Sequence, residues 1–213
     1  MNDSDVDDRP PSAAEAQDLI REQRALASRS ISPDPRTLYW PWSIAWLVGF
    51  GCLYLRFGPD DQVLVPMPEW LPLTVLYVMM AAALVISGVS GARHARHIKG
   101  DSQVKGATYG FAWFLGFAGI GVSAGRVSDL LPPAETGLLW AGLSVAFVAA
   151  MYLAGGALWG ERDMVILGVW VGVVNVVGVL VGPGWHSLII ATAGAAGGLV
   201  AGYVAARRLN RGS

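Results

Sequence analysis

Apolar residues along this chain fall into six long stretches that are separated by short polar segments. Each stretch is close to the ~20 residues that an α-helix needs to cross the ~30 Å hydrocarbon core of a bilayer. None of them has a charged residue at its centre. The stretches cover about residues 39–57, 70–91, 106–125, 134–159, 164–182 and 185–206. The pattern predicts an all-α, polytopic membrane protein with six transmembrane helices.

Lys and Arg residues are concentrated in alternate gaps between these stretches. Thirteen of the fifteen lie before the first stretch, in the second and fourth gaps, or after the last stretch. Because cytoplasmic loops retain Lys and Arg, this distribution predicts that the N-terminus and the C-terminus are both cytoplasmic. We divide the chain into a tail of residues 1–37, a six-helix domain of residues 38–206 and a basic end of residues 207–213.

Composition and charge further limit the kind of protein that this chain can be. The net charge of −1 does not provide the concentrated basic surface that nucleic-acid binding needs. Abundant Gly, Ala, Val and Arg with few Lys are typical of a high-GC bacterium, so we expect a plasma-membrane location with the lipid bilayer as the main surrounding. The first thirty residues show no secretory signal pattern, and the first apolar stretch is expected to act as its own insertion signal.

The tail contains one local helix signal. Ser12 followed by Glu15 matches a capping box, in which the two side chains satisfy free backbone N–H groups at a helix start. Apolar residues recur near helical spacing as far as Ile31, and Pro33 and Pro35 then end the pattern. We expect an amphipathic helix over residues 12–31. Three roles stay open for it: binding a cytoplasmic protein partner, lying on the inner leaflet, or remaining solvated next to the membrane.

Small residues predict where helices pack. Gly194, Gly198 and Gly202 repeat every four residues in the last stretch, which gives a flat helix face that another backbone can approach closely. The fifth stretch has two similar glycine pairs, and the short turn at 182–184 predicts an antiparallel hairpin between the last two helices. These three glycines are our candidates for helix packing.

Polar residues near or inside the membrane are the candidate sites. Asn175 is the only carboxamide inside a membrane stretch, and its donors and acceptor need partners in hydrocarbon, either another helix or a substrate. Arg56 and Arg126 end the first and third helices on the outer side, with Asp60 and Asp129 close in sequence. We expect ion pairs at this outer rim, with a small polar vestibule as the alternative.

Two other patterns are weaker. His94 and His97 are three residues apart near Asp101, but the surrounding Lys and Arg would repel a metal ion, and we expect no metal site. The residues 121–125 spell a nucleophile elbow around Ser123, with His186 on the same predicted side. That motif has its mechanical meaning at a strand-to-helix turn, whereas here it lies at a helix end. We expect no catalytic site and no cofactor.

Several short segments resemble a family of small six-helix membrane proteins of high-GC bacteria, whose members are labelled transporters or permeases. The matching segments are Pro35-Arg36, Tyr39, Pro41-Trp42, Ala45-Trp46, Gly49-Phe50, Gly58-Pro59-Asp60, the residues 113–117 and the residues 153–159. The resemblance implies a multi-pass membrane protein and assigns no functional residue.

Three functions follow from these patterns. The first is a non-enzymatic accessory or permease-like component of a transport or signalling assembly. The second is a stand-alone transporter or channel. Because no ionisable residue lies within the predicted bundle, such a protein would move a small uncharged solute or form a pore as a homo-oligomer. The third and most remote is a membrane enzyme.

Overall fold

The computed structural model describes residues 12, 14–19, 34–95 and 101–211. The chain divides into two compact units, Met1–Ser32 and Pro33–Ser213. In the first unit, the Ser12 backbone N–H donates to Glu15 Oε2 at 2.7 Å, and the Glu15 N–H donates to Ser12 Oγ at 3.4 Å. This confirms the predicted capping box, and residues 14–19 are helical. Residues 20–31 of the predicted tail helix lie outside the described part.

The second unit is helical, and its described residues contain no β-strand. Its elements are α2 (Pro35–Arg56), the short 3-10 helix η1 (Pro59–Asp61), α3 (Trp70–Ala95), α4 (Asp101–Ser128), α5 (Pro133–Trp159), α6 (Arg162–Val181), α7 (Trp185–Ile189), the π-helix η2 (Ile190–Gly194) and α8 (Ala195–Arg211). The last three form one continuous span. Six spans are long and apolar enough to cross a membrane, which confirms the predicted fold class. Cytoplasmic placement of the termini stays a prediction.

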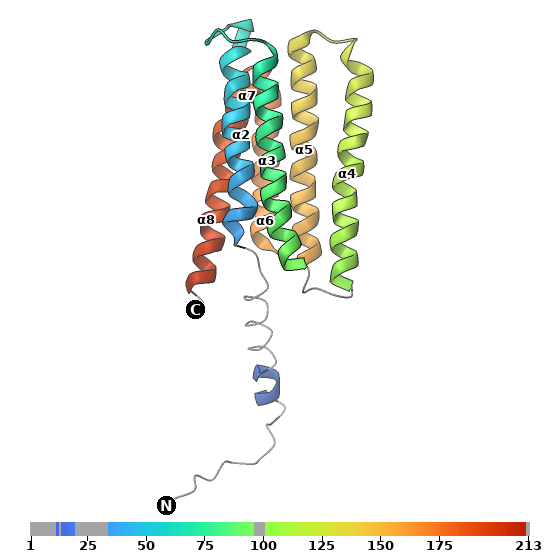
Figure 1. Ribbon diagram of the computed structural model, residues 1–213, viewed down its shortest axis with the longest axis vertical. Helices are drawn as coiled ribbons and strands as arrows, with labels where there is room; N and C mark the ends of the chain where they lie inside the picture. Colours follow the sequence, from blue (N-terminus) through green and yellow to red (C-terminus); the bar gives the residue numbers. More distant parts are fainter. Residues whose placement is uncertain (1–11, 13, 20–33, 96–100, 212–213) are drawn as a thin grey trace, which may run out of the picture. The chain divides into compact units, whose positions relative to one another are not determined.

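The long helices run alternately up and down (Figure 1). We call the end where α2 begins and α8 ends the basal end, and the opposite end the distal end. The helices continue beyond the apolar stretches, since α4 begins at Asp101 and not near residue 106. Hydropathy reports the segment in contact with hydrocarbon, whereas backbone hydrogen bonding can continue past it. At the basal start of α2, Asp34 Oδ1 accepts from the Arg36 N–H at 2.9 Å and caps the helix.

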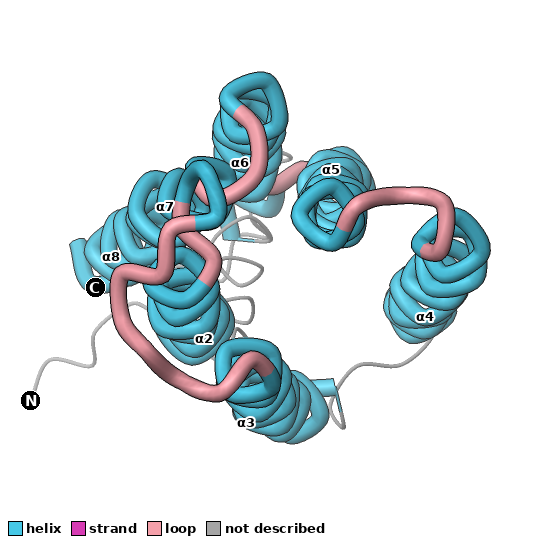
Figure 2. Tube along the Cα trace, turned by 90° about the horizontal axis from the view of Figure 1, so that it is seen from above, coloured by secondary structure: helices cyan, strands magenta, loops and turns pink. Residues whose placement is uncertain are grey.

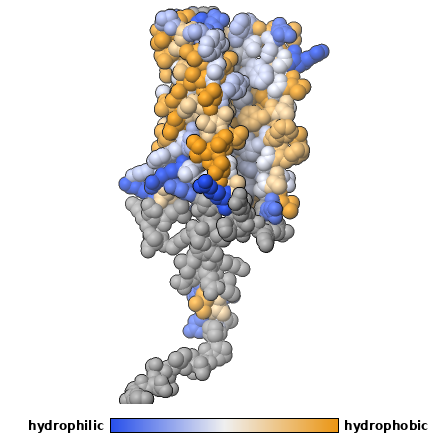
Figure 3. All heavy atoms as spheres, in the orientation of Figure 1, coloured by the Kyte–Doolittle hydropathy of each residue, from blue (hydrophilic) through white to orange (hydrophobic). Residues whose placement is uncertain are grey.

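The helices do not contribute equally to the bundle. Helix α2 packs against α3 and α8, and α5 packs against α6, whereas α4 stands at the edge and packs mainly against α5 (Figure 2). Eleven buried residues from α2, α3, α5, α6, η2 and α8 form the hydrophobic core, and none of them comes from α4. On the face shown in Figure 3, strongly hydrophilic residues gather at the two ends, and hydrophobic residues together with residues of intermediate hydropathy cover the length between them, as expected for a membrane-spanning unit.

The glycine face of the last span, formed by Gly194 of η2 and by Gly198 and Gly202 of α8, packs as predicted. A Cβ at Gly194 would lie 3.3 Å from the Trp46 ring, and a Cβ at Gly202 would lie 2.8 Å from the Trp40 ring. Between them, a Cβ at Gly198 would overlap Ser43 Oγ. Trp40, Ser43 and Trp46 are spaced by three along α2 and therefore follow one helix face. The last and first spans thus meet through small residues on α8 and larger ones on α2.

Candidate functional site

A buried polar network joins three helices near the distal end. Asn175 on α6 is 5% exposed, and its Nδ2 donates to the Gly142 carbonyl of α5 at 3.0 Å. Its Oδ1 lies 2.9 Å from Nε2 of His186, in the first turn of α7. His186 is 2% exposed. The candidate residue Asn175 therefore has its partners inside the protein, and the network connects α5, α6 and α7.

The orientation of the Asn175 amide follows from its partners. A carbonyl only accepts hydrogen bonds, so the Gly142 oxygen requires the NH₂ group of Asn175 to face it. The Asn175 oxygen then faces His186, and His186 Nε2 must carry the proton that it donates. In the neutral ring this leaves Nδ1 as the remaining acceptor. The network is thus directional, running from His186 through Asn175 to the backbone of α5.

Glycine makes room for the imidazole. Gly178 lies on α6 nearly one turn beyond Asn175, and a Cβ there would come within 2.8 Å of His186 Cδ2. One of the glycines predicted to bring the hairpin together therefore also accommodates the His186 ring. Phe50 of α2 lies edge-on to the imidazole, with ring centroids 6.3 Å apart. Aromatic and small residues thus enclose the only ionisable side chain in this network.

The distal turn after α6 leads into His186, whose backbone N–H donates to the Gly182 carbonyl at 3.0 Å. Gly184 has a φ of +78°, a left-handed conformation that favours glycine, and a Cβ there would be 2.5 Å from the Pro59 nitrogen. The turn therefore packs directly on the segment at Gly58 and Pro59. The two backbones approach this closely because Gly184 has no side chain.

A π-helix follows His186 within the same span. Residues Ile190–Gly194 form η2, and Ile190, Ala191 and Gly194 are buried. A π-helix inserts an extra residue into a helical turn and occurs frequently at functional sites. His186 of the buried polar network and the irregular turn are therefore close together on the last span.

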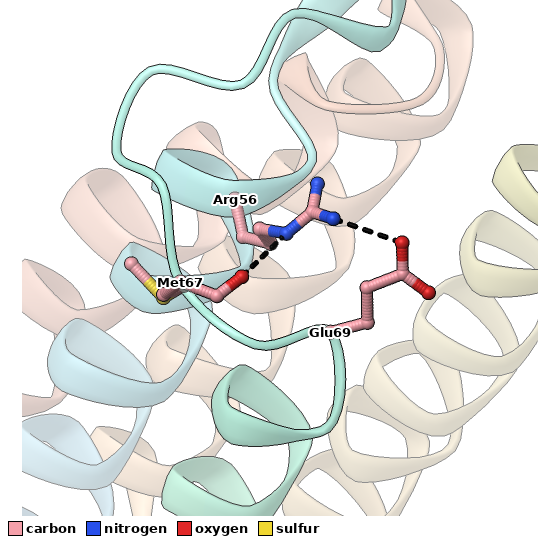
Figure 4. A network of polar contacts seen from close by, with 3 residues as sticks. All are labelled: Arg56, Met67 and Glu69. Carbon is pink, nitrogen blue, oxygen red and sulfur yellow. Dashed lines mark hydrogen bonds and ion pairs between the residues drawn. The ribbon is translucent and has the colours of Figure 1, made fainter.

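Arg56, the first residue of the predicted outer rim, is paired at the distal end of α2. Arg56 donates from Nε to the Met67 carbonyl and from Nη2 to Glu69 Oε1, both at 2.9 Å (Figure 4). Arg56 therefore pairs with Glu69, which the sequence analysis did not consider, and not with Asp60. Asp60 lies in η1 with a φ of +55°. The Arg56 contacts attach the loop before α3 to the end of α2.

The second half of the proposed rim is not joined to the first. Arg126 is on α4 and Asp129 follows that helix, and both are exposed. Within the described residues, neither of them takes part in an ion pair. A polar vestibule shared by Arg56 and Arg126 stays a prediction.

The structure describes the Ser123 motif, but it describes only part of the His94 and His97 pair. Ser123 is exposed within the continuous helix α4, and His186 is hydrogen-bonded to Asn175, so the structure does not bring these two residues together. The side chain of His94 and all of His97 lie outside the described residues. The sequence analysis considered His186 only as a partner for Ser123. The signal that could have pointed to the pairing of His186 with Asn175 was a histidine two residues after the Gly-Pro-Gly turn, on the helix paired with that of Asn175 in the predicted hairpin.

Comparisons with protein-family models, with curated protein sequences and with solved structures each found no match. The six-span bundle and its buried network are therefore interpreted from this chain's own residues.

Proposed function

We propose that this chain is a non-enzymatic, multi-pass component of a bacterial plasma membrane, acting as an accessory or permease-like subunit of a transport or signalling assembly. One observation carries the proposal. Among the described residues, the buried polar side chains are Ser43, Asn175 and His186, and each is hydrogen-bonded within the bundle. Polar groups that are already paired in a membrane interior stabilise the packing of helices and leave little capacity for binding a solute.

The unequal burial of the spans supports the same proposal. Only 6% of the most apolar window of α4 is buried, compared with 33% for α6 and for the last span. A span that contributes so little to its own core leaves most of its surface to the surroundings. A subunit of a larger assembly would present such a surface to its partner, and the cytoplasmic partner would bind through residues 12–31.

A second candidate is a stand-alone transporter or channel for a small uncharged solute. The observation that favours it is the π-helix η2 next to the His186 network, since irregular turns inside a membrane span accompany functional sites. An opening of the bundle at this point would exchange the His186 to Asn175 hydrogen bond for a bond to solute.

Reconstitution separates these two functions. The purified full chain is placed in liposomes, and the permeability to glycerol and urea is measured by stopped-flow light scattering. The accessory role predicts rates equal to those of empty liposomes for the wild type and for Asn175→Leu. A flux that scales with protein content and changes in Asn175→Leu would replace the accessory proposal with the transporter.

Crosslinking in native membranes tests the lateral partner. A photoreactive residue at Phe114 of α4, which is 67% exposed, should give discrete adducts with another membrane protein. The matched control is Val176 of α6, which is 58% exposed, and it should give lipid adducts only. Lipid adducts alone from both positions would contradict a subunit role for α4.

A further inference from the structure

A lateral groove separates α6 from α8 toward the basal end. It has a volume of about 380 Å³ and its walls are almost entirely apolar, formed by Ile166 and Trp170 from α6 and by Val200 and Val204 from α8. Leu167, which is buried in the core, forms part of its back wall. The groove lies on the surface of two membrane spans, so the surrounding hydrocarbon has direct access to it.

Each end of the groove is defined by a specific interaction. At its inner end, Trp170 Nε1 donates to the Ala193 carbonyl at 2.9 Å, and the indole lies against Gly197. At its basal end, Arg208 Nη1 pairs with Asp163 Oδ1 at 2.6 Å. Asp163 and Trp170 are seven residues apart on α6, which corresponds to a depth of about 10 Å at 1.5 Å per residue. The groove is therefore short and apolar, and it has a charged ion pair at its basal end.

At the basal end of the groove, the positive charge is more exposed than the negative charge. The Arg208 side chain is 63% exposed, whereas the Asp163 side chain is only 20% exposed. Arg208 has five N–H donors and uses one of them on Asp163, so its other donors can bind a further anion. The chain neighbours Arg162 and Arg207 are exposed cations as well. Basic residues at a membrane surface attract anionic lipid headgroups by ~1 kcal/mol each.

From this geometry we infer that the groove binds one acyl chain of an anionic phospholipid, with the phosphate at Arg208. An apolar groove that opens into hydrocarbon is filled by an acyl chain more favourably than by water. An arginine at its mouth forms charge-assisted hydrogen bonds with phosphate oxygens. The two halves of the site thus match the two halves of one lipid molecule, and the inference does not depend on the proposed function.

Asp163 acts as an internal competitor at this site. Its carboxylate occupies one side of the Arg208 guanidinium, which a lipid phosphate would otherwise use. Removing the carboxylate therefore frees Arg208 and should strengthen binding of the lipid, whereas removing the guanidinium should weaken it. An ion pair with a purely structural role would give the same direction of effect for both changes.

Lipid-dependent thermal unfolding tests the site on the purified full chain in detergent. Phosphatidylglycerol should raise the unfolding temperature at lower concentration than phosphatidylcholine with the same chains. Arg208→Gln should raise the half-saturating concentration of phosphatidylglycerol by roughly tenfold, as for the loss of one charge-assisted hydrogen bond. Val200→Trp, which fills the groove, should also weaken binding, and Asp163→Asn should strengthen it.

Matched controls lie elsewhere on the bundle. Arg93→Gln removes an exposed basal cation from α3, and Val122→Trp enlarges an exposed residue of α4 far from the groove lining, so neither should alter the lipid response. Inorganic phosphate alone should not reproduce the shift, because it lacks the acyl chain. The inference is overturned if both phospholipids act equally, if inorganic phosphate gives the whole effect, or if Val200→Trp and Asp163→Asn both respond like the wild type.

Discussion

The last span, made of α7, η2 and α8, and helix α4 are both rich in glycine, yet the bundle packs against the glycine face of the last span and leaves most of the α4 glycines open. Gly194 of η2 and Gly198 and Gly202 of α8 each face a side chain of α2. On α4, no atom of a neighbouring element lies within 4 Å of the Cβ position at Gly106, Gly110, Gly119 or Gly121. The same residue type forms a packed face in the last span and open positions on α4.

This difference shows what a small-residue face does and does not specify. A helix without side chains on one face permits close approach, but the energy comes from the residues that enter the space. On α8 these are the Trp and Ser residues of α2, and the Trp40 indole reaches the Leu199 carbonyl at 3.2 Å. Helix α4 contacts mainly α5, and there the contact is made by large rings, since Phe147 lies against Gly116 and Phe117.

The largest expected effect comes from filling the packed face. Gly198→Leu should lower the free energy of unfolding by about 1–3 kcal/mol, because the new side chain overlaps Ser43 and forces α8 away from α2. The measurement is thermal or denaturant unfolding in detergent. The control is Gly110→Leu on α4, where a Cβ would meet no neighbouring atom within 4 Å. This change should leave the unfolding free energy unchanged or raise it slightly, because leucine has the higher helix propensity. Equal losses of unfolding free energy in Gly198→Leu and Gly110→Leu would contradict the distinction between packed and open glycines.

A smaller effect is expected from the buried polar network, where α7 is held by hydrogen bonds as well as by packing. Asn175→Leu removes the bonds to Gly142 and His186, and interhelical bonds in membranes contribute ~0.6 kcal/mol on average and up to ~1.7. We expect a loss of about 1–2 kcal/mol in unfolding free energy.

A double-mutant cycle with His186→Phe isolates the pair. Because the first substitution already breaks the bond, the double variant should lose less than the sum of the single variants. Additive losses would mean that Asn175 and His186 contribute independently.

The ion pair at the distal end should contribute less again, because it is open to solvent. Glu69 is 78% exposed and Arg56 is 16% exposed. Glu69→Gln should change the unfolding free energy by no more than ~1 kcal/mol, and less at high salt. Arg56→Gln should cost more, since it also removes the bond to the Met67 carbonyl. The contrary result is that Glu69→Gln lowers the unfolding free energy as much as Asn175→Leu does, and by the same amount at high salt. That result would show that solvent exposure does not set the order of these effects.

The smallest effect is expected at the capping box, whose two residues are exposed. Hydrogen bonds from the Ser12 backbone N–H and then from its hydroxyl lower the pKa of the Glu15 carboxyl below its usual range. A lowered pKa in the folded state means that the cap is stabilised at pH values above the ordinary Glu pKa, and that this is lost as the pH falls through the lowered value.

Carboxyl NMR titration of the full chain measures this shift. Glu15 should titrate below an ordinary Glu, and Ser12→Ala should bring the pKa of Glu15 back toward that ordinary value. The thermal unfolding of the bundle should be the same for Ser12→Ala and the wild type. A loss of bundle stability in Ser12→Ala would show that the tail supports the six-helix core.

Several features of this protein could be predicted from local sequence. Six apolar stretches of the required length gave the number of spans, because a bilayer admits few other structures for such segments. The pairing of Ser12 with Glu15 followed from a three-residue spacing that places both groups at one helix start. The glycine repeat at 194, 198 and 202 predicted a close contact, although it did not name α2 as the partner.

The candidate site was predictable only in part, since its two side chains come from different helices. Asn175 was identified because a carboxamide in hydrocarbon needs partners, but His186 was placed on the outer side and its burial was missed. Its burial depends on the hairpin turn, on the space at Gly178 and on the Phe50 ring of α2. Arg56 was likewise matched with nearby acidic residues, whereas the loop before α3 brings Glu69 to it.

The sequence by itself determined the number of spans, their approximate length and the local caps, because these depend on hydropathy and on hydrogen bonds between residues a few positions apart. The tertiary structure decided which glycines are packed, which polar groups meet and where a groove remains between α6 and α8. In a membrane, every span satisfies its own backbone and is apolar on all sides. Hydropathy therefore leaves the choice of neighbours open, and side-chain shape and the few buried hydrogen bonds make it.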